Sequence, residues 1–289
     1  MDISDASTHL YWWQSLDAHW QQLLLLNREI NRNITSQQLT AVLQSKQNYY
    51  APPMLLYQTL YQQTFYPNRR MVTEALLAEI LALKECFVQS SHLTHLDPIA
   101  DLPSLEVLLA HSNPLQSLRP LAANTALRSL DVSRTALESL APIAVLKQLQ
   151  WLNIGNTRIS GIEELAELTD LRTLILDHTP VADLSPLAEL SQLRTLSCAF
   201  TSVKHLYALE GLQRLKVLKI GMTGIADLTP ATSWTNLEEL HLWGTQVRSL
   251  EPLYELPQLK LLHIALQKHL SAQEVKHFQS HRPACKVVL

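Results

Sequence analysis

The chain has 289 residues, of which 47% are apolar and 17% charged, and its formal net charge is −3. This composition is typical of a folded, near-neutral soluble protein and excludes both a disordered chain and one with a strongly basic or acidic tail. The longest pure aliphatic run, Leu23 to Leu26, is far shorter than the ~20 residues that span a bilayer, so we expect no membrane segment.

Residues 1–82 are predicted to form a helical N-terminal region that caps the rest of the chain. Apolar side chains between Leu10 and Ile30 recur at steps of three, four and seven, which predicts one amphipathic helix. Pro52-Pro53 and Pro67-Asn68 separate further helical segments, the last of them over residues 71–81. The first helix carries three tryptophans, which we interpret as a cover for an exposed core rather than as a ligand-stacking cluster: Trp12, Trp13 and Trp20.

From Leu83 onward, a pattern of 22 residues recurs without insertion or deletion. Each unit starts with Leu, at positions 83, 105, 127, 149, 171, 193, 215 and 237, and a ninth, partial unit starts at Leu259. Counted from that Leu, positions 1, 4, 6, 11, 14 and 17 are apolar in all eight full units. A unit this short buries its apolar side chains only by stacking on its neighbours, so residues 83–266 are predicted to form a solenoid.

Two other positions in the unit predict its turns. Position 9 is Ser, Asn or, from Thr135 onward, Thr, and a short polar side chain there is expected to satisfy buried backbone groups where the chain leaves the strand. Position 16 is Pro in six of eight units, which predicts a short turn or 3₁₀ segment. The pattern ends after Leu259, and residues 267–289 are predicted to form a cap with a helix that begins after Ser271 and contains Phe278, followed by a closing strand.

Residues 83–266 resemble a leucine-rich repeat array, and the form L-x-x-L-x-L-x-x-T-x-I-x-x-L-x-P-L is similar to the 22-residue class of bacterial internalins and their cytoplasmic relatives. The resemblance implies an α/β solenoid, namely a right-handed horseshoe with a parallel β-sheet on its concave face, short turns on its convex face and an N-terminal helical cap. It also implies protein partners and no catalytic residues. Neither a secretion signal nor a cell-wall sorting motif is found, so the invasion role of secreted internalins is not carried over.

The strand of each unit is expected to cover roughly positions 3 to 7. Positions 4 and 6 then point inward, positions 3, 5 and 7 lie on the concave face, and positions 2 and 8 form its margins. We predict two protein-binding patches on this face. The C-terminal patch comprises Lys219, Glu239, His241, Trp243, Leu261 and His263. The N-terminal patch comprises Asp131, Arg134, Trp151, Asn153, Asn156, Asp177 and His178.

The leading hypothesis is that a protein partner binds the concave face, with the chain as its possible regulator or inhibitor. It depends on Trp151 and Trp243, which we expect to be exposed, because Trp is over-represented among interface hot spots. The alternative is a mainly structural solenoid whose concave face is simply solvated. No cofactor is expected under either hypothesis.

Metal binding, catalysis and nucleic-acid binding are weaker candidates. His241 and His263 share position 5 on adjacent strands, but no Cys or clear carboxylate completes a metal site. Asp177 lies next to His178, but no nucleophile accompanies them and no Gly-rich phosphate loop is present. Position 2 forms a partly basic ridge that acidic residues interrupt, which favours steering of an acidic protein surface over nucleic-acid binding.

The cysteines and the N-terminus together predict a cytoplasmic location. Cys86 and Cys198 occupy inward positions five units apart, roughly 24 Å at ~4.8 Å per strand, which is too far for a disulfide. The third, Cys285, is expected to be a packed residue of the cap. The N-terminal segment has neither the positive region nor the apolar region of a secretory signal. Free thiols in a reducing compartment fit these features.

Overall fold

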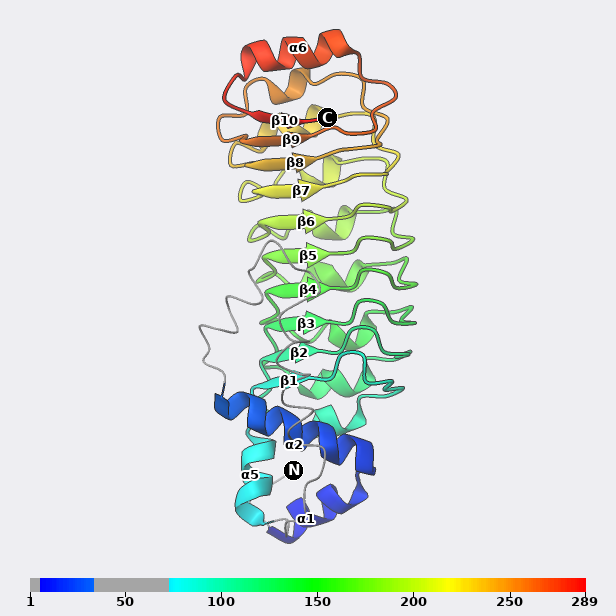
Figure 1. Ribbon diagram of the computed structural model, residues 1–289, viewed down its shortest axis with the longest axis vertical. Coiled ribbons are helices and arrows are strands. Elements are labelled where there is room, and N and C mark those ends of the chain that lie inside the picture. The colour runs from blue at the N-terminus through cyan, green and yellow to red at the C-terminus, as the bar shows by residue number, and fades with distance from the viewer. Residues whose placement is uncertain (1–5, 34–72) are drawn as a thin grey trace.

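A computed structural model of the chain describes residues 6–33 and 73–289, and the helices predicted between residues 35 and 61 lie outside this part. Figure 1 shows ten parallel strands stacked into one ladder in the order of the chain, with helices at both ends. The helices are α1 (Ala6–Ser15), α2 (Ala18–Asn33), α5 (Glu74–Leu81) and α6 (Ala272–His281). The strands are β1 (Glu85–Phe87), β2 (Val107–Leu109), β3 (Ser129–Asp131), β4 (Trp151–Asn153), β5 (Thr173–Ile175), β6 (Thr195–Ser197), β7 (Val217–Lys219), β8 (Glu239–His241), β9 (Leu261–His263) and β10 (Lys286–Val288).

The register of the sheet follows the repeat of the sequence. Between β1 and β9 each strand residue pairs with the residue 22 positions further along, as Glu85 does with Val107. The regular strand is shorter than expected and covers only positions 3 to 5. Backbone hydrogen bonds to the next coil nevertheless continue, as from the Ile154 amide to the Ile175 carbonyl at 2.8 Å. The sheet is therefore wider than its strand bounds suggest.

The chain leaves the sheet at position 8, where every coil adopts a left-handed backbone conformation. The φ angle lies between 53° and 67° at Ser90, Ser112, Arg134, Asn156, His178, Phe200, Met222, Gly244 and Leu266. Only Gly and, to a lesser degree, Asn adopt this conformation with little strain. In most coils, therefore, the surrounding structure keeps position 8 in a left-handed conformation that its residue type does not favour.

The core is the column of inward side chains that the sequence predicts. All residues at positions 1, 4, 6, 11, 14 and 17 of the eight full units are buried. The position-9 prediction is also confirmed, because the hydroxyl of each of the six Thr residues donates to the buried carbonyl of position 6, as Thr179 does to Leu176 at 2.6 Å. These bonds satisfy a backbone group inside each turn.

The outer side of each coil is a 3₁₀ segment, and Pro occupies the start of six of the eight. The segments are η1 (Asp97–Asp101), η2 (Arg119–Ala123), η3 (Ala141–Ile143), η4 (Glu163–Glu167), η5 (Ser185–Leu187), η6 (Tyr207–Leu209), η7 (Thr229–Ser233) and η8 (Glu251–Leu253). The predicted turns on this side are thereby confirmed.

The single helix predicted between Leu10 and Ile30 is wrong, because the chain breaks there into α1 and α2. The Ser15 hydroxyl donates to the Trp12 carbonyl at 2.6 Å, and the Asp17 carboxylate accepts from the Trp20 amide at 2.9 Å. Asp17 therefore acts as an N-terminal cap of α2, a local signal that competes with the continuous apolar stripe. Trp13 and Trp20 are buried in the core, as expected of a cap.

Helix α2 also protects the free edge of the sheet. It lies across the N-terminal end of the ladder beside β1 (Figure 1). The buried side chain of Asn27 accepts a hydrogen bond from the Phe87 amide at 2.6 Å and donates one to the Phe87 carbonyl at 3.1 Å. An edge strand otherwise exposes such groups for pairing with another chain, and Asn27 occupies them.

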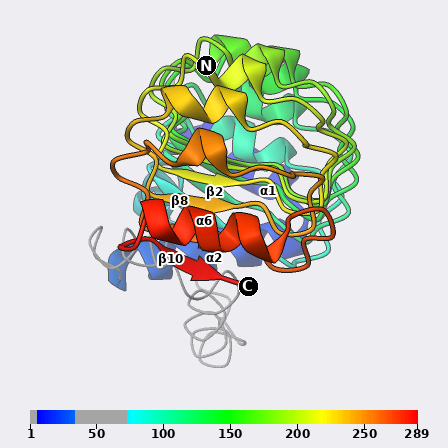
Figure 2. The same cartoon turned by 90° about the horizontal axis from the view of Figure 1, so that it is seen from above.

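The C-terminal cap forms as predicted. The Ser271 hydroxyl accepts from the Glu274 amide and begins α6, and β10 pairs in parallel with β9. Seen along the stack, α6 covers the last coil (Figure 2). Within the described residues, none of the helices has the length and apolar character needed to cross a bilayer.

Candidate functional site

The side of the sheet that carries positions 3, 5 and 7 is here called the open face, and its N-terminal end is not accessible. Leu26 and Ile30 of α2 pack there against the apolar side chains of Phe87, Val107 and Leu109. The face is consequently available only from β3 onward. The sequence did carry a signal for this cover, because three apolar residues, Phe87, Val107 and Leu109, occupy positions 3 and 5 of the first two units and are unnecessary on a solvated face.

Polar residues of the N-terminal patch mainly hold one another. The Asp131 carboxylate accepts from the Ser133 hydroxyl at 2.7 Å and from the Asn153 amide nitrogen at 3.2 Å. The Asn153 side-chain oxygen in turn accepts from the Gly155 backbone at 3.0 Å. Asn153 is only 5% exposed, so the expectation that it is presented to a partner is wrong. This network stabilises the turns after β3 and β4.

Asp177 and His178 make different contacts on the next coil, and the backbone is left-handed at His178. The Asp177 carboxylate accepts from the Ser197 hydroxyl at 2.7 Å and from the Ala199 amide at 2.8 Å. Burial raises the pKa of Asp177 above its usual range, although these hydrogen bonds oppose the shift. His178 instead stacks on Phe200, with ring centroids 4.1 Å apart. The two side chains form no catalytic pair.

The remaining N-terminal-patch residues lie at the two margins of the face. Trp151 is half-buried at position 3 of β4, whereas Arg134 and Asn156 are exposed at position 8, after their strands have ended. Trp151, at position 3, and Trp243, at position 7, are therefore toward opposite sides of the open face and four coils apart, so they do not contact each other.

The C-terminal patch contains a row at position 5, here called the basic row: Lys219, His241 and His263. All three are partly exposed, and the two imidazole centroids are 5.6 Å apart. Burial lowers the pKa of His241, with further lowering by the charges of Lys219 and His263. Glu239 opposes this shift from 3.7 Å. In the part of the chain that the structure describes, no three His, Cys, Asp or Glu side chains are arranged to hold a metal ion.

Trp243 lies over the backbone of Gly221 and is half-buried, so it is less exposed than the sequence predicts. A methyl group at Gly221 would overlap the indole ring. The ring also meets Phe200 edge-on, with centroids 5.3 Å apart. Trp243 thus crosses the neighbouring coil, which contains Gly221, and reaches Phe200 on the coil beyond it. The missing side chain of Gly221 leaves the space for the indole ring.

Bulky apolar side chains occupy position 8 of the coils around Trp243, which itself stands at position 7 beside Gly244. We call the following set the apolar rim: Phe200, Met222, Trp243 and Leu266. Phe200 is 40% exposed, Met222 44% and Leu266 73%. These three residues are absent from the predicted patches, although the N-terminal patch includes other position-8 residues, because the sequence gives no sign that the left-handed turn leaves apolar side chains exposed there.

The basic ridge at position 2 is partly neutralised within the chain. Glu106 forms ion pairs with Lys84 and Arg128, and Glu238 does so with Lys216 and Lys260. The two ammonium groups lower the pKa of Glu238 to about 2. The two glutamates that interrupt the ridge therefore form ion pairs with the coils on both sides of them.

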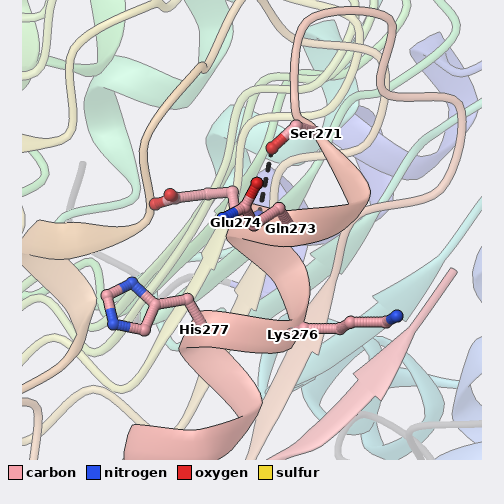
Figure 3. A pocket seen from close by; sticks show the side chains of 5 residues that line it. All are labelled: Ser271, Gln273, Glu274, Lys276 and His277. Carbon is pink, nitrogen blue, oxygen red and sulfur yellow. Dashed lines mark hydrogen bonds between the residues drawn. The ribbon is translucent and has the colours of Figure 1, made fainter.

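A pocket of about 590 Å³ lies along α6 and is not part of the open face. Its lining residues are Ser271, Gln273, Glu274, Lys276 and His277 (Figure 3). Lys276 and His277 point to opposite sides of the helix in this view. The Glu274 carboxylate already accepts from the Leu250 amide at 2.7 Å, so the pocket marks the junction of the cap with the last coil.

The comparisons with known proteins agree with this geometry. A family model described as leucine-rich repeats in two copies matches residues 147–189. The solenoid has the leucine-rich repeat fold. A comparison with curated protein sequences finds no match.

Solved structures share the leucine-rich repeat fold. An internalin from Listeria monocytogenes is 25% identical with a TM-score of 0.68, and the alignment covers 72% of this chain and 62% of the internalin. Internalin C2 from the same organism is 29% identical with a TM-score of 0.65, covering 73% of this chain and 92% of that one. A leucine-rich repeat protein from Leptospira interrogans is 22% identical with a TM-score of 0.69, covering 75% and 56%, and shows the fold alone.

Proposed function

We propose that this leucine-rich repeat array binds a protein partner through the open face of β5 to β9, with the apolar rim as its anchor. Leucine-rich repeat proteins generally bind protein partners on such extended surfaces. The observation that carries the proposal is the choice of Phe200, Met222 and Leu266 at position 8. A bulky apolar residue is disfavoured there twice, because the backbone is left-handed and the side chain is exposed.

The first five coils support this proposal by contrast. Position 8 is polar in those units, with Ser90, Ser112, Arg134, Asn156 and His178. In the sixth, seventh and ninth coils, bulky apolar side chains replace these polar ones at the same strained position. They are exposed, so they add nothing to the core. Strain of this kind, of order 1–3 kcal/mol per residue, tends to persist at functional sites. Contact with a partner gives the apolar side chains the burial that the monomer does not.

The proposed role is non-enzymatic, and its biological form is regulation or inhibition of the partner. The N-terminal patch contributes through Trp151, Arg134, Asn156 and His178, whose ring stacks on Phe200 of the apolar rim, whereas its carboxylates and Asn153 are engaged in turns. The C-terminal patch and the apolar rim carry the contact.

We also propose a reducing, cytoplasmic setting. All three cysteines are free and buried, and burial raises the pKa of the Cys86 thiol to about 12. Buried thiols of this kind act as small packing residues and need no oxidising compartment. Cell fractionation would test the proposal, and recovery of the protein mainly outside the cytoplasmic fraction would contradict it.

Affinity capture from a native lysate with quantitative mass spectrometry tests the binding role. The test variant is Phe200→Asn with Met222→Asn, because Asn tolerates a left-handed backbone and keeps the fold. The matched control is Val145→Asn, which removes an exposed apolar side chain of the outer side. We expect the rim variant to lose the captured partner with an unchanged melting temperature, and the control to retain it.

Equal capture by the rim variant would refute the proposed site. A wild-type chain that captures no partner above background would favour the alternative, a mainly structural solenoid without a dedicated ligand.

A further inference from the structure

Charge is distributed unevenly along the open face and its margins. Across β5 to β9, positions 2, 3, 5, 7 and 8 hold five Lys or Arg against three Asp or Glu, an excess of two positive charges. The same positions across β1 to β4 hold three of each. The whole chain has a formal charge of −3, so the excess is local and opposite in sign to the protein as a whole.

Several of these positive charges have no ion-pair partner in the part of the fold that the structure describes. Lys216 and Lys260 are paired with Glu238, whereas no ion pair within the described residues engages Arg172, Arg194 or Lys219. Lys219 stands in the basic row, beside His241 and next to the apolar rim. The Lys219 charge and the exposed apolar side chains thus lie on the same coils of the open face.

We propose that the partner presents an extended acidic segment in which carboxylates alternate with bulky apolar side chains. The carboxylates lie on the basic row, and the apolar side chains lie on the apolar rim. This inference rests on the proposed function and adds the chemical class of the partner.

The spacing of the two surfaces fits such a segment. Neighbouring strands are ~4.8 Å apart, so the basic row from Lys219 to His263 spans roughly 10 Å across β7 to β9. Same-side residues of an extended chain are ~6.6 Å apart, so two carboxylates separated by one residue reach along that row. A segment that runs along the stack between the two surfaces, with its side chains pointing sideways, directs the carboxylates to the basic row and the intervening residues to the apolar rim.

Binding of such a segment strengthens as the pH falls. The charged groups that face His241 are Lys219 on β7, Glu239 on its own strand and His263 on β9. In the free protein, burial and the neighbouring cations keep the pKa of His241 below its usual range. A bound carboxylate raises that pKa, so binding is coupled to proton uptake and weakens again as the pH rises through the pKa of the complex.

A display library of random 12-residue peptides, panned on the full chain, is the test. We expect selected peptides to be rich in Asp or Glu alternating with Phe, Trp, Leu or Met. Their affinity, measured by fluorescence anisotropy, should fall about tenfold in Lys219→Gln and about tenfold in Phe200→Asn, since a charge-assisted contact and a buried aromatic each contribute on the order of 1.4 kcal/mol. Affinity should rise from pH 8 to pH 6 in the wild type and much less in His241→Gln.

Selection of neutral or basic peptides that still require Phe200 would overturn the acidic-segment inference and leave the binding site intact. Peptides insensitive to both Lys219→Gln and Phe200→Asn, or no enrichment at all, would overturn both the inference and the proposed site.

Discussion

Single hydroxyl groups hold the turns of the solenoid. Thr179 is 3% exposed, and its hydroxyl is the partner of the buried Leu176 carbonyl. Thr179→Val keeps the side-chain shape but leaves that carbonyl unpaired, which should cost about 1 to 3 kcal/mol of unfolding free energy. Thr179→Ser retains the hydroxyl and is the control. Chemical denaturation compares the variants, and a stable Thr179→Val variant beside a destabilised Thr179→Ser variant would mean that packing of the methyl group matters instead.

Asp177 predicts a dependence of stability on pH. Its pKa is raised in the folded state by burial, so the protonated form is favoured there and the wild type loses stability as the pH rises through that pKa. Asp177→Asn keeps an oxygen that accepts from Ala199 without the buried charge. The variant should be at least as stable as the wild type at about pH 7, and this advantage should shrink at about pH 4.5. Melting temperatures at both pH values check this; a variant that is equally destabilised at both would contradict it.

At the residue scale, the sequence predicted which side chains point inward and failed for those at the turn. Periodicity identifies the core because inward positions repeat without exception. The left-handed backbone at position 8 has no such signature, since Ser, Arg, Phe and Met all occupy it. Phe200, Met222 and Leu266 were missed for that reason, and so was the packing of Trp243 over Gly221 toward Phe200, two coils away.

At the scale of elements, the two caps differ in how far the sequence reveals them. The helix after Ser271 has a local capping signal and was predicted. Helix α2 is defined by Asp17 at its start and by Asn27 against the edge of β1, a contact between residues 60 positions apart. A single sequence contains no periodic signal for such a long-range pair.

Replacement of Asn27 by Ala should loosen the N-terminal coil. The substitution removes both hydrogen bonds to Phe87, and two unsatisfied buried backbone groups cost about 2 to 5 kcal/mol. Because a repeat array opens locally, we expect faster hydrogen exchange in β1 and β2 and little change in β7 to β9. Thiol labelling gives a second readout, since Cys86 in β1 should react before Cys198, which follows β6. Uniformly faster exchange along the array would contradict this local role.

At the scale of the whole molecule, a linear array separates stability from recognition. The inward column is nearly uniform along the stack, whereas the open face changes. Helix α2 covers it at β1 and β2, and its polar side chains bond to one another at β3 to β5. At β6 to β9 the face is basic and apolar. The repeat predicted the solenoid because every coil obeys the same rule. It could not predict the functional end, because that end is defined by departures from the rule.

The most direct test of the proposed binding surface is a hydrogen-exchange footprint of the protein with its captured partner. We expect protection to be concentrated in residues 173–266, from β5 to β9, and to be strongest at the strand ends that carry the basic row and the apolar rim. Residues 83–109 should be unchanged, since α2 already covers that part of the face. Protection confined to the 3₁₀ segments of the outer side, or to β1 to β4, would contradict the central claim.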